Sequence, residues 1–305
     1  MIESQTGSAN PVPPVTGQIN EDDELLASLE QAILRSVKGQ ARFISEAPHM
    51  VRKAVDEVID SPRTGRFLLE ELEKTEKTYL GTKVEILLRN WLALPRGDVL
   101  DLSIDGIETD VKNTVADDWM IPHEAVDRPC LLVMIDDKCS RFSIGLIVAR
   151  KAYLRDSKNQ DGKGQISAAG KRHIKWLIRD ASYPENPWQR FDPEIRKSIT
   201  KPGGGSKRVD ALFRLIQKTP ISRSLVLGVA LQKDAMRRLR RNGGARDSLA
   251  RDGIVLLSGN YDKKQIEALG LPKCRRDEFI SFTAVTEPEK KLLQTKNRSK
   301  KKRRK

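Results

Sequence analysis

The chain has 305 residues, enough for two domains of ordinary size, and it is 38% hydrophobic and only 5% aromatic. It contains no apolar run long enough to cross a bilayer and no secretory signal, which excludes a membrane-spanning protein and predicts a cytoplasmic one. Three scattered cysteines and three isolated histidines exclude a disulfide framework and argue against zinc, so a catalytic metal would need oxygen ligands.

The net charge of +14 is unevenly spread along the chain. The last ten residues, KNRSKKKRRK, carry eight positive charges, which leaves six for the rest of the chain. A basic body with a strongly basic tail favours polyanionic partners, nucleic acid first among them. For the tail alone, a solubilising role is an equally good explanation.

Helices are predicted in the first hundred residues. Residues 1–20 are polar and rich in proline and glycine, which predicts disorder. A helix is expected after Asp22, where leucine and isoleucine recur on one face. Residues 67–94 are also helix-forming, although Gly81 weakens this helix and can divide it into two pieces.

The segments that follow predict a β-sheet. Asp105-Gly106, within DLSIDGIETDVK, is a strong signal for a two-residue hairpin turn. The apolar runs at 129–137 and 142–149 are typical of buried central strands. Together with the helices, they predict an α/β fold in which a mixed β-sheet is flanked by helices.

The composition changes in the second half. A polar, glycine-containing stretch predicts a linker, and KRHIKWLIRDA (171–181) predicts a basic helix. After a break at PGGGS (202–206), three short helices and a strand predict a mainly α winged helix-turn-helix domain of the CAP type. The three helices are expected at 207–219, 221–230 and 234–242. The predicted organisation is a disordered N-terminus (1–20), a first domain (21–157), a linker (158–165), the winged helix-turn-helix domain (166–285) and a basic tail (286–305).

The predicted hairpin brings two aspartates together. If its turn has two residues, Asp101 lies opposite Asp110. Because side chains alternate across a strand, one face carries a polar set: Asp101, Ser103, Glu108, Asp110 and Lys112. The other face is directed to the core: Leu102, Ile104, Ile107, Thr109 and Val111.

Two opposed aspartates favour a cation between them, because like charges at this separation destabilise a hairpin. Carboxylate oxygens suit Mg²⁺, and Lys112 is placed to stabilise charge on a phosphate. Glu108 is predicted to be a bystander. The alternative is a solvated strand face with mixed charges, which the hairpin by itself favours.

The preceding helix offers a third carboxylate. Lys77, Gly81 and Glu85 are spaced by four and share one helical face. Glu85 can join the metal site, but an ion pair with Arg89 explains it equally well, and the residues alone leave both possibilities open.

The order of a helical Glu, an Asp and an Asp-x-Lys triplet resembles the core of the PD-(D/E)xK nucleases. More closely, the chain resembles the NaeI-like family of type IIE restriction endonucleases over about residues 50–275. The segments that carry the resemblance are RTGRF (63–67), KTEKTYLGTKVEI (74–86), GIETDVK (106–112), GGARDSLARDGIVLL (243–257) and LGLP (269–272).

The resemblance implies a bacterial, cytoplasmic homodimer that cuts double-stranded DNA with Mg²⁺ as its cofactor. Glu85, Asp101 and Asp110 would hold the metal, and Lys112 would be the catalytic lysine. The resemblance also implies that the first domain is the endonuclease and that the second binds another copy of DNA, which activates cleavage. The implied target is GCCGGC.

Candidate DNA contacts are basic residues in both halves. Arginines at four positions between 237 and 241 cover a broad strip of the predicted third helix, which suits phosphates and one or two guanine edges. The predicted DNA-binding residues are Arg63, Arg66, Lys77, Arg237, Arg238, Arg240, Arg241 and Arg246. The alternatives are a solvated basic helix for the arginines of the second half and surface salt bridges for the three others.

Two further functions compete with a site-specific endonuclease. One is a non-catalytic DNA-binding regulator whose first domain dimerises, and the other is a repair nuclease of low specificity with the same core. The acidic cluster discriminates against the regulator, because a regulator has no use for opposed aspartates beside a lysine.

Overall fold

The computed structural model describes residues 16–158, 163–231, 235–239 and 244–290. The chain folds into two compact units and passes between them three times. The first unit comprises Met1–Val58 and Leu72–Glu185, and the second comprises Ile59–Glu71 and Asn186–Lys305. Within the described residues, no helix is both long enough and apolar enough to cross a membrane.

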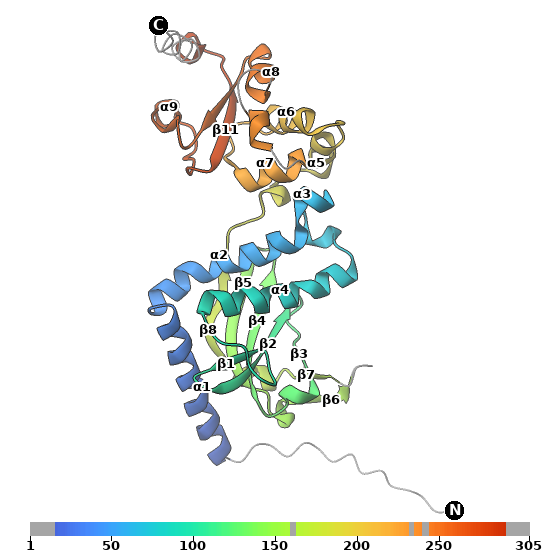
Figure 1. Cartoon of the computed structure of the whole chain (residues 1–305), viewed down its shortest axis with the longest axis vertical. Helices are drawn as coiled ribbons and strands as arrows, with labels where there is room; N and C mark the ends of the chain where they lie inside the picture. Colours follow the sequence, from blue (N-terminus) through green and yellow to red (C-terminus); the bar gives the residue numbers. More distant parts are fainter. Residues whose placement is uncertain (1–15, 159–162, 232–234, 240–243, 291–305) are drawn as a thin grey trace, which may run out of the picture. The chain divides into compact units, whose positions relative to one another are not determined.

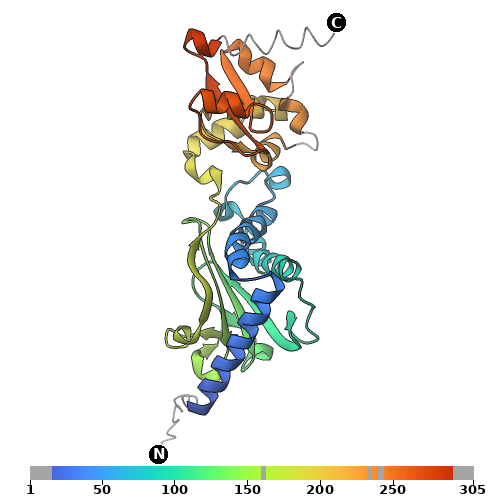
Figure 2. The ribbon, with the colours of Figure 1, turned by 90° about the vertical axis from the view of Figure 1, so that its left-hand side faces the viewer.

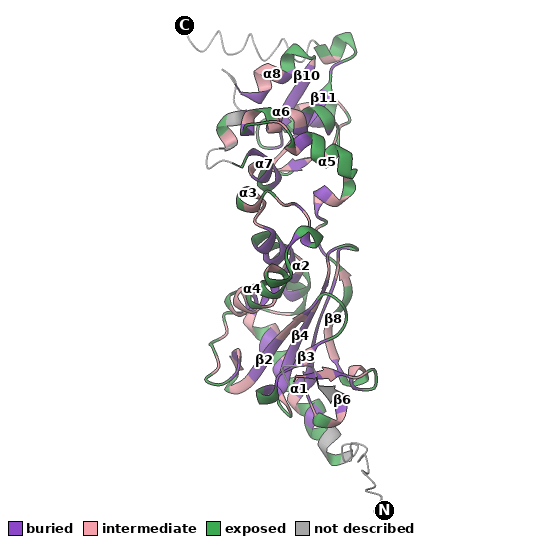
Figure 3. Ribbon diagram, turned by 90° about the vertical axis from the view of Figure 1, so that its right-hand side faces the viewer, coloured by how far each residue is buried: buried purple, intermediate pink, exposed green. Residues whose placement is uncertain are grey.

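A five-stranded mixed sheet forms the centre of the first unit (Figure 1). Its strands, in spatial order, are β1 (Leu102–Ile104), β2 (Ile107–Thr114), β4 (Pro129–Asp136), β5 (Arg141–Val148) and β8 (Lys175–Ser182). β2 and β4 run parallel, and the other neighbours run antiparallel. β4 and β5 confirm the two predicted central strands, and they are buried along most of their length (Figure 3).

Three long helices accompany the sheet: α1 (Thr16–Ser36), α2 (Gln40–Ile59) and α4 (Lys74–Leu92). Figures 1 and 2 show α2 and α4 crossing the same face of the sheet. The buried Arg52 of α2 donates a hydrogen bond to Asp137, directly after β4, at 2.8 Å. The Tyr183 hydroxyl donates to the same carboxylate at 2.6 Å, so a buried polar network fastens α2 to the sheet.

The N-terminal helix begins earlier than the sequence predicts. α1 starts at Thr16, inside the segment 1–20 that was expected to be disordered and before the expected start at Asp22. The carboxylate of Asp22 accepts two hydrogen bonds from Arg150, at 2.6 and 3.0 Å, so this part of the helix is anchored to the residues that follow β5. Residues 1–15 lie outside the described part of the chain.

The segment expected to be a linker, 158–165, belongs to the first unit. β6 (Leu154–Lys158) and β7 (Gly164–Ile166) pair antiparallel in a small sheet with β3 (Met120–Ile121), so the segment joins two paired strands. Its residues 159–162 lie outside the described part. The predicted basic helix at 171–181 is also wrong, because most of it forms β8, the edge strand that pairs with β5.

The second unit contains six α-helices and a three-stranded antiparallel sheet among its described residues. Apart from α3, described below, the helices are α5 (Pro193–Thr200), α6 (Gly205–Leu215), α7 (Arg223–Ala230), α8 (Ala245–Arg251) and α9 (Lys263–Ala268). The sheet has the order β10 (Ile254–Ser258), β11 (Glu278–Thr283) and β9 (Ile221–Ser222). α6 and α7 confirm two of the three short helices that the sequence predicts.

The third predicted helix, at 234–242, is only partly found. The described residues form a 3₁₀ turn, η6 (Ala235–Leu239), and residues 240–243 lie outside the description. The third α-helix of the series is instead α8, which begins after Gly244. The remaining short helices of the chain are α3 (Ser61–Thr64), η1 (Leu69–Glu71), η2 (His123–Ala125), η3 (Lys151–Tyr153), η4 (Gly170–His173) and η5 (Pro187–Arg190).

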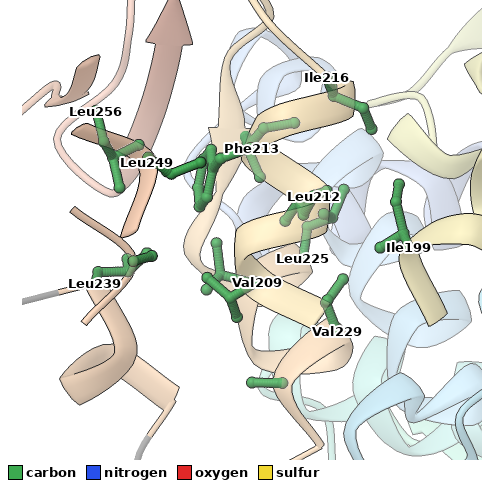
Figure 4. Packing of buried hydrophobic residues seen from close by; sticks show 14 of the residues in the cluster. Ile199, Val209, Leu212, Phe213, Ile216, Leu225, Val229, Leu239, Leu249 and Leu256 are labelled. Carbon is green, nitrogen blue, oxygen red and sulfur yellow. The ribbon is translucent and has the colours of Figure 1, made fainter. Parts of the chain in front are cut away.

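The core of the second unit explains why residues 59–71 belong to it. Side chains of α6, α7, α8 and β10 pack together, with Phe213 and Leu212 near the centre (Figure 4). Phe67 joins this core, where its ring centroid lies 4.1 Å from that of Trp188. Asn186 donates a side-chain hydrogen bond to the Phe67 carbonyl at 2.8 Å. The expected domain ranges were 21–157 and 166–285. In the structure, the segment 59–71 belongs to the second unit instead of the first, and the later boundary between the two units lies between residues 185 and 186.

Candidate active site

Helix α4 carries Glu85. It begins with a capping box, in which the Glu73 amide donates to the Glu76 carboxylate at 2.8 Å. Its buried stripe is Leu80, Val84, Leu88 and Leu92, and the helix packs on β2. The helix is continuous through Gly81, contrary to the expected division, and it places Glu85 directly after a buried valine.

The hairpin has the predicted register. Asp105 and Gly106 have φ angles of 51° and 81°, the left-handed conformation that a tight two-residue turn requires. The pairs observed are Leu102 with Thr109, Ser103 with Glu108, and Ile104 with Ile107. Asp101 directly precedes β1, so the turn brings it back toward the part of β2 that bears Asp110 and Lys112.

Lys112 is shared by two carboxylates. Its Nζ lies 2.7 Å from Asp110 Oδ2 and 3.8 Å from Asp101 Oδ2. It also donates a hydrogen bond to the Val111 carbonyl at 3.1 Å. Asp101 Oδ2 accepts a hydrogen bond from the Val111 amide at 2.8 Å, which orients this carboxylate. Three of the residues predicted from the sequence therefore meet in one small cluster.

Asp110 is not on a solvated strand face. Only 3% of the residue is exposed, and on the neighbouring strand it lies beside the buried Cys130. Burial raises the pKa of Asp110 to about 7 against the opposing effect of the Lys112 ammonium, and Asp101 adds to the increase. The alternative of an ordinary solvated strand is therefore wrong at this position.

Both explanations of Glu85 hold in part. Its carboxylate accepts a hydrogen bond from Arg89 at 3.1 Å, which is the ion pair expected at this helical spacing. Burial raises the pKa of Glu85, and the negative charge of Asp101 raises it further, while Arg89 and Lys112 oppose the increase. Glu85 therefore lies within the electrostatic reach of the hairpin cluster.

The carboxylate oxygens of this site suit a hard cation, although the carboxylates do not converge on one point in the structure. Within the residues that the structure describes, no three His, Cys, Asp or Glu side chains converge as a metal cluster. Asp110 Oδ2, however, is buried, and Lys112 Nζ lies 2.7 Å from it as a charge-assisted contact. A buried anionic oxygen with unused acceptor capacity, beside the oxygens of Asp101, suits Mg²⁺.

Glu108 has a role that the sequence did not reveal. It takes no part in the contacts between Lys112, Asp110 and Asp101, as expected of a bystander. Its carboxylate instead accepts hydrogen bonds from three consecutive backbone amides, those of Asp98, Val99 and Leu100. These bonds hold the pKa of Glu108 below its usual range. The spacing of charges along a strand carries no signal for such a contact, because it depends on the path of the preceding loop.

The three candidate DNA contacts from the first half of the sequence are divided between the two units. Lys77 is exposed on α4, in the same unit as the cluster. Arg63 and Arg66 belong to the second unit. Arg63 forms an exposed ion pair with Asp60 at 3.0 Å, the surface salt bridge considered as its alternative.

The arginines of the second half differ in their surroundings. Arg237 is exposed in η6, which also contains the backbone of Arg238. Arg240 and Arg241 lie outside the described residues. Arg246 donates hydrogen bonds to the carbonyls of Leu239 and Leu256, at 3.0 and 2.7 Å. These contacts give Arg246 a structural role, because it braces η6 and β10 against α8.

Two comparisons with known proteins identify the family to which the chain belongs. The sequence profile of the family described as Restriction endonuclease NaeI matches residues 35–291. A curated relative, the Type II restriction enzyme NaeI of Lentzea aerocolonigenes, is 31% identical over 255 residues, which cover 81% of this chain and 80% of the relative. The matched range contains Glu85 on α4 and the hairpin residues Asp101, Asp110 and Lys112. The chain therefore belongs to the NaeI family of restriction endonucleases.

Proposed function

We propose that this chain cuts double-stranded DNA at specific sites by Mg²⁺-dependent hydrolysis of phosphodiester bonds, with Glu85, Asp101, Asp110 and Lys112 as its active site. The observation that carries the proposal is the buried Asp110 carboxylate in contact with Lys112. Burying a carboxylate is costly, and perturbed ionisable groups of this kind concentrate at functional sites. Membership of the NaeI family supplies the reaction class.

Each residue has a role that follows from its contacts. Asp110, Asp101 and Glu85 would hold Mg²⁺, which supplies charge neutralisation at phosphate oxygens and acidifies water. Lys112 donates hydrogen bonds to the reacting phosphate, and its positive charge stabilises the negative charge that develops there. Because an ammonium group has three protons, Lys112 can serve the phosphate while it keeps its contact with Asp110. The Val111 amide keeps Asp101 oriented throughout.

The second unit is proposed as a winged helix-turn-helix module that binds another copy of DNA as an effector, in a protein that acts as a homodimer. Its order of α6, β9, α7, α8, β10 and β11 supports this assignment, since three helices alternate with a small antiparallel sheet. The exposed Arg237 is a candidate phosphate contact. The effector role and the dimer rest on the family resemblance.

Cleavage of a plasmid of complex sequence tests the enzymatic part. Purified protein should give discrete bands with Mg²⁺ and none with EDTA, and the Asp110→Ala variant should give none in either case. Sequencing of the ends then tests GCCGGC as the target. A smear would indicate a repair nuclease of low specificity. DNA binding without cleavage of any substrate would indicate a regulator and would refute the proposal.

Stimulation by a second DNA tests the effector part. A plasmid with a single site should be cut slowly, and a short duplex containing the same site should accelerate its cleavage when added in trans. A duplex with a scrambled site is the matched control. If both duplexes act alike, or if the rate only falls through competition, the second unit does not bind an effector.

A further inference from the structure

The carboxylate of Glu108 holds the loop that precedes β1. Its Oε1 accepts the Asp98 amide at 2.7 Å, and its Oε2 accepts the amides of Val99 and Leu100 at 3.2 and 2.7 Å. Glu108 lies on β2, where it pairs with Ser103 across the hairpin. One side chain of β2 therefore fixes the backbone of three successive residues outside the sheet.

The loop is built closely around this carboxylate. A Cβ atom on Gly97 would lie 2.5 Å from Glu108 Oε2 and 2.5 Å from the Leu100 carbonyl oxygen, so only glycine fits there. At the far side of the loop, the Ser103 amide donates to the Pro95 carbonyl at 3.0 Å. The segment 97–100 consequently has little freedom as long as the Glu108 carboxylate is in place.

The residue that leaves this loop is Asp101. Its peptide bond joins it directly to Leu100, whose amide makes one of the two shortest bonds to Glu108. The Asp101 side chain meets the Val111 amide at 2.8 Å, three residues along β2 from Glu108. Strand β2 therefore holds Asp101 from both directions: Glu108 holds the backbone before it, and Val111 holds its carboxylate.

We propose that Glu108 is a positioning residue that places Asp101 in the active site by clamping the backbone of residues 98–100. This inference rests on the proposed function, because it concerns the same cluster. Glu108 acts through Asp101 and contacts neither DNA nor metal in this proposal. A misplacement of about 1 Å in a catalytic group can cost about 100-fold in rate, so the loss of a clamp of this kind has a measurable effect.

Glu108→Gln is the appropriate variant. A carboxylate accepts hydrogen bonds at both oxygens, whereas glutamine offers one acceptor oxygen and turns an NH₂ donor toward amides that are themselves donors. At least one of the three amides therefore loses its partner with almost no change in volume. Gly97→Ala is a second, independent variant, because its Cβ would displace the loop from the Glu108 carboxylate.

Hydrogen exchange of the Val111 amide tests the inference without metal or DNA. This amide is protected by Asp101 Oδ2, so a displaced Asp101 exposes it. We expect roughly tenfold faster exchange in Glu108→Gln and in Gly97→Ala. In an Asp101→Ala background, Glu108→Gln should add no further acceleration, because the two changes act on one element. The matched control is Glu289→Gln, since Glu289 also accepts two backbone amides, at 2.8 Å each, in the second unit.

Cleavage kinetics give a second readout. Glu108→Gln should lower the single-turnover rate about 10- to 100-fold and raise the Mg²⁺ concentration for half-maximal rate, with DNA affinity within about twofold of the wild type. Glu289→Gln should leave the single-turnover rate, the Mg²⁺ requirement and the DNA affinity unchanged. Unaltered Val111 exchange in both clamp variants would overturn the inference, and so would an equal acceleration in the Asp101→Ala background. If the wild-type protein cuts no DNA, the proposed function fails, and the exchange measurement still decides the role of Glu108.

Discussion

Lys112 Nζ lies 2.7 Å from the buried Asp110 Oδ2, on the same strand and two residues away in sequence. Residues at this spacing share one face of a strand, so the contact follows from the Asp-x-Lys pattern itself. The same ammonium lies 3.8 Å from Asp101. One positive charge thus balances two carboxylates that would otherwise repel each other.

The buried Asp110 should make the stability of the metal-free protein depend on pH. Its pKa is raised from 3.8 to about 7 in the folded state, so the folded protein keeps a proton that the unfolded chain loses. The stabilisation is complete below about pH 4 and is lost as the pH rises to about 7. In EDTA, Asp110→Asn should therefore gain stability relative to the wild type across this window, by on the order of 2–4 kcal/mol at pH 8.

Denaturant unfolding of both proteins at several pH values between 4 and 8 measures this effect. The difference between the two proteins matters, because Glu85, whose pKa is also raised by burial, contributes with the same sign to both. A difference that stays constant over the whole range would show that Asp110 ionises normally in the folded protein.

Gly81 should be replaceable with a gain in stability. It lies in the middle of α4 without a positive φ. Among the described residues, and apart from the neighbouring backbone of the helix itself, no atom lies within 4 Å of the position that a Cβ would take. Gly81→Ala should raise the free energy of unfolding by about 0.5–1 kcal/mol. Gly106→Ala is the opposite case, because Gly106 has a φ of 81° and its replacement should destabilise the hairpin. Urea unfolding of both variants checks the pair, and a destabilised Gly81→Ala would contradict the description of α4.

Substitution of Arg246 should mainly lower the stability of the protein, whereas substitution of Arg237 should mainly weaken its binding to DNA. Arg246→Ala removes the donors of two backbone carbonyls and should cost about 1–3 kcal/mol of stability. Arg237 is exposed, where a surface contact contributes about 0–1 kcal/mol, so Arg237→Ala should cost less stability than Arg246→Ala. It should weaken DNA binding and reduce the logarithmic salt dependence of binding by about one. Thermal unfolding and DNA titrations at several salt concentrations provide both quantities. Arg246→Ala with native stability but weaker DNA binding would reverse the assignment.

The parts of the site that depend on local periodicity could be predicted from the sequence. Asp105-Gly106 fixed the turn, the turn fixed the register, and the register brought Asp101 toward Asp110. The role of Glu108 could not be predicted, because its partners are backbone amides of a loop without periodicity. The burial of Asp110 also depends on β4, which lies beside β2 only in the folded sheet.

The errors in the fold have a common physical cause. Residues 171–181 have a helical pattern of apolar residues, but most of them form β8, because pairing with β5 outweighs local propensity. The segment 59–71 is read locally as a continuation of the first unit, whereas Phe67 packs with Trp188 across more than a hundred residues of sequence. Long-range packing of this kind leaves no trace in a short window.

The most direct test of the account is the single-turnover rate of DNA cleavage by Lys112→Met at saturating DNA and Mg²⁺. The account predicts a rate about 10²- to 10³-fold below that of the wild type, with DNA affinity nearly unchanged. Lys138→Met, which alters an exposed lysine of the turn between β4 and β5, should cleave at the wild-type rate. Cleavage by Lys112→Met at the wild-type rate would contradict the assignment of this cluster as the active site.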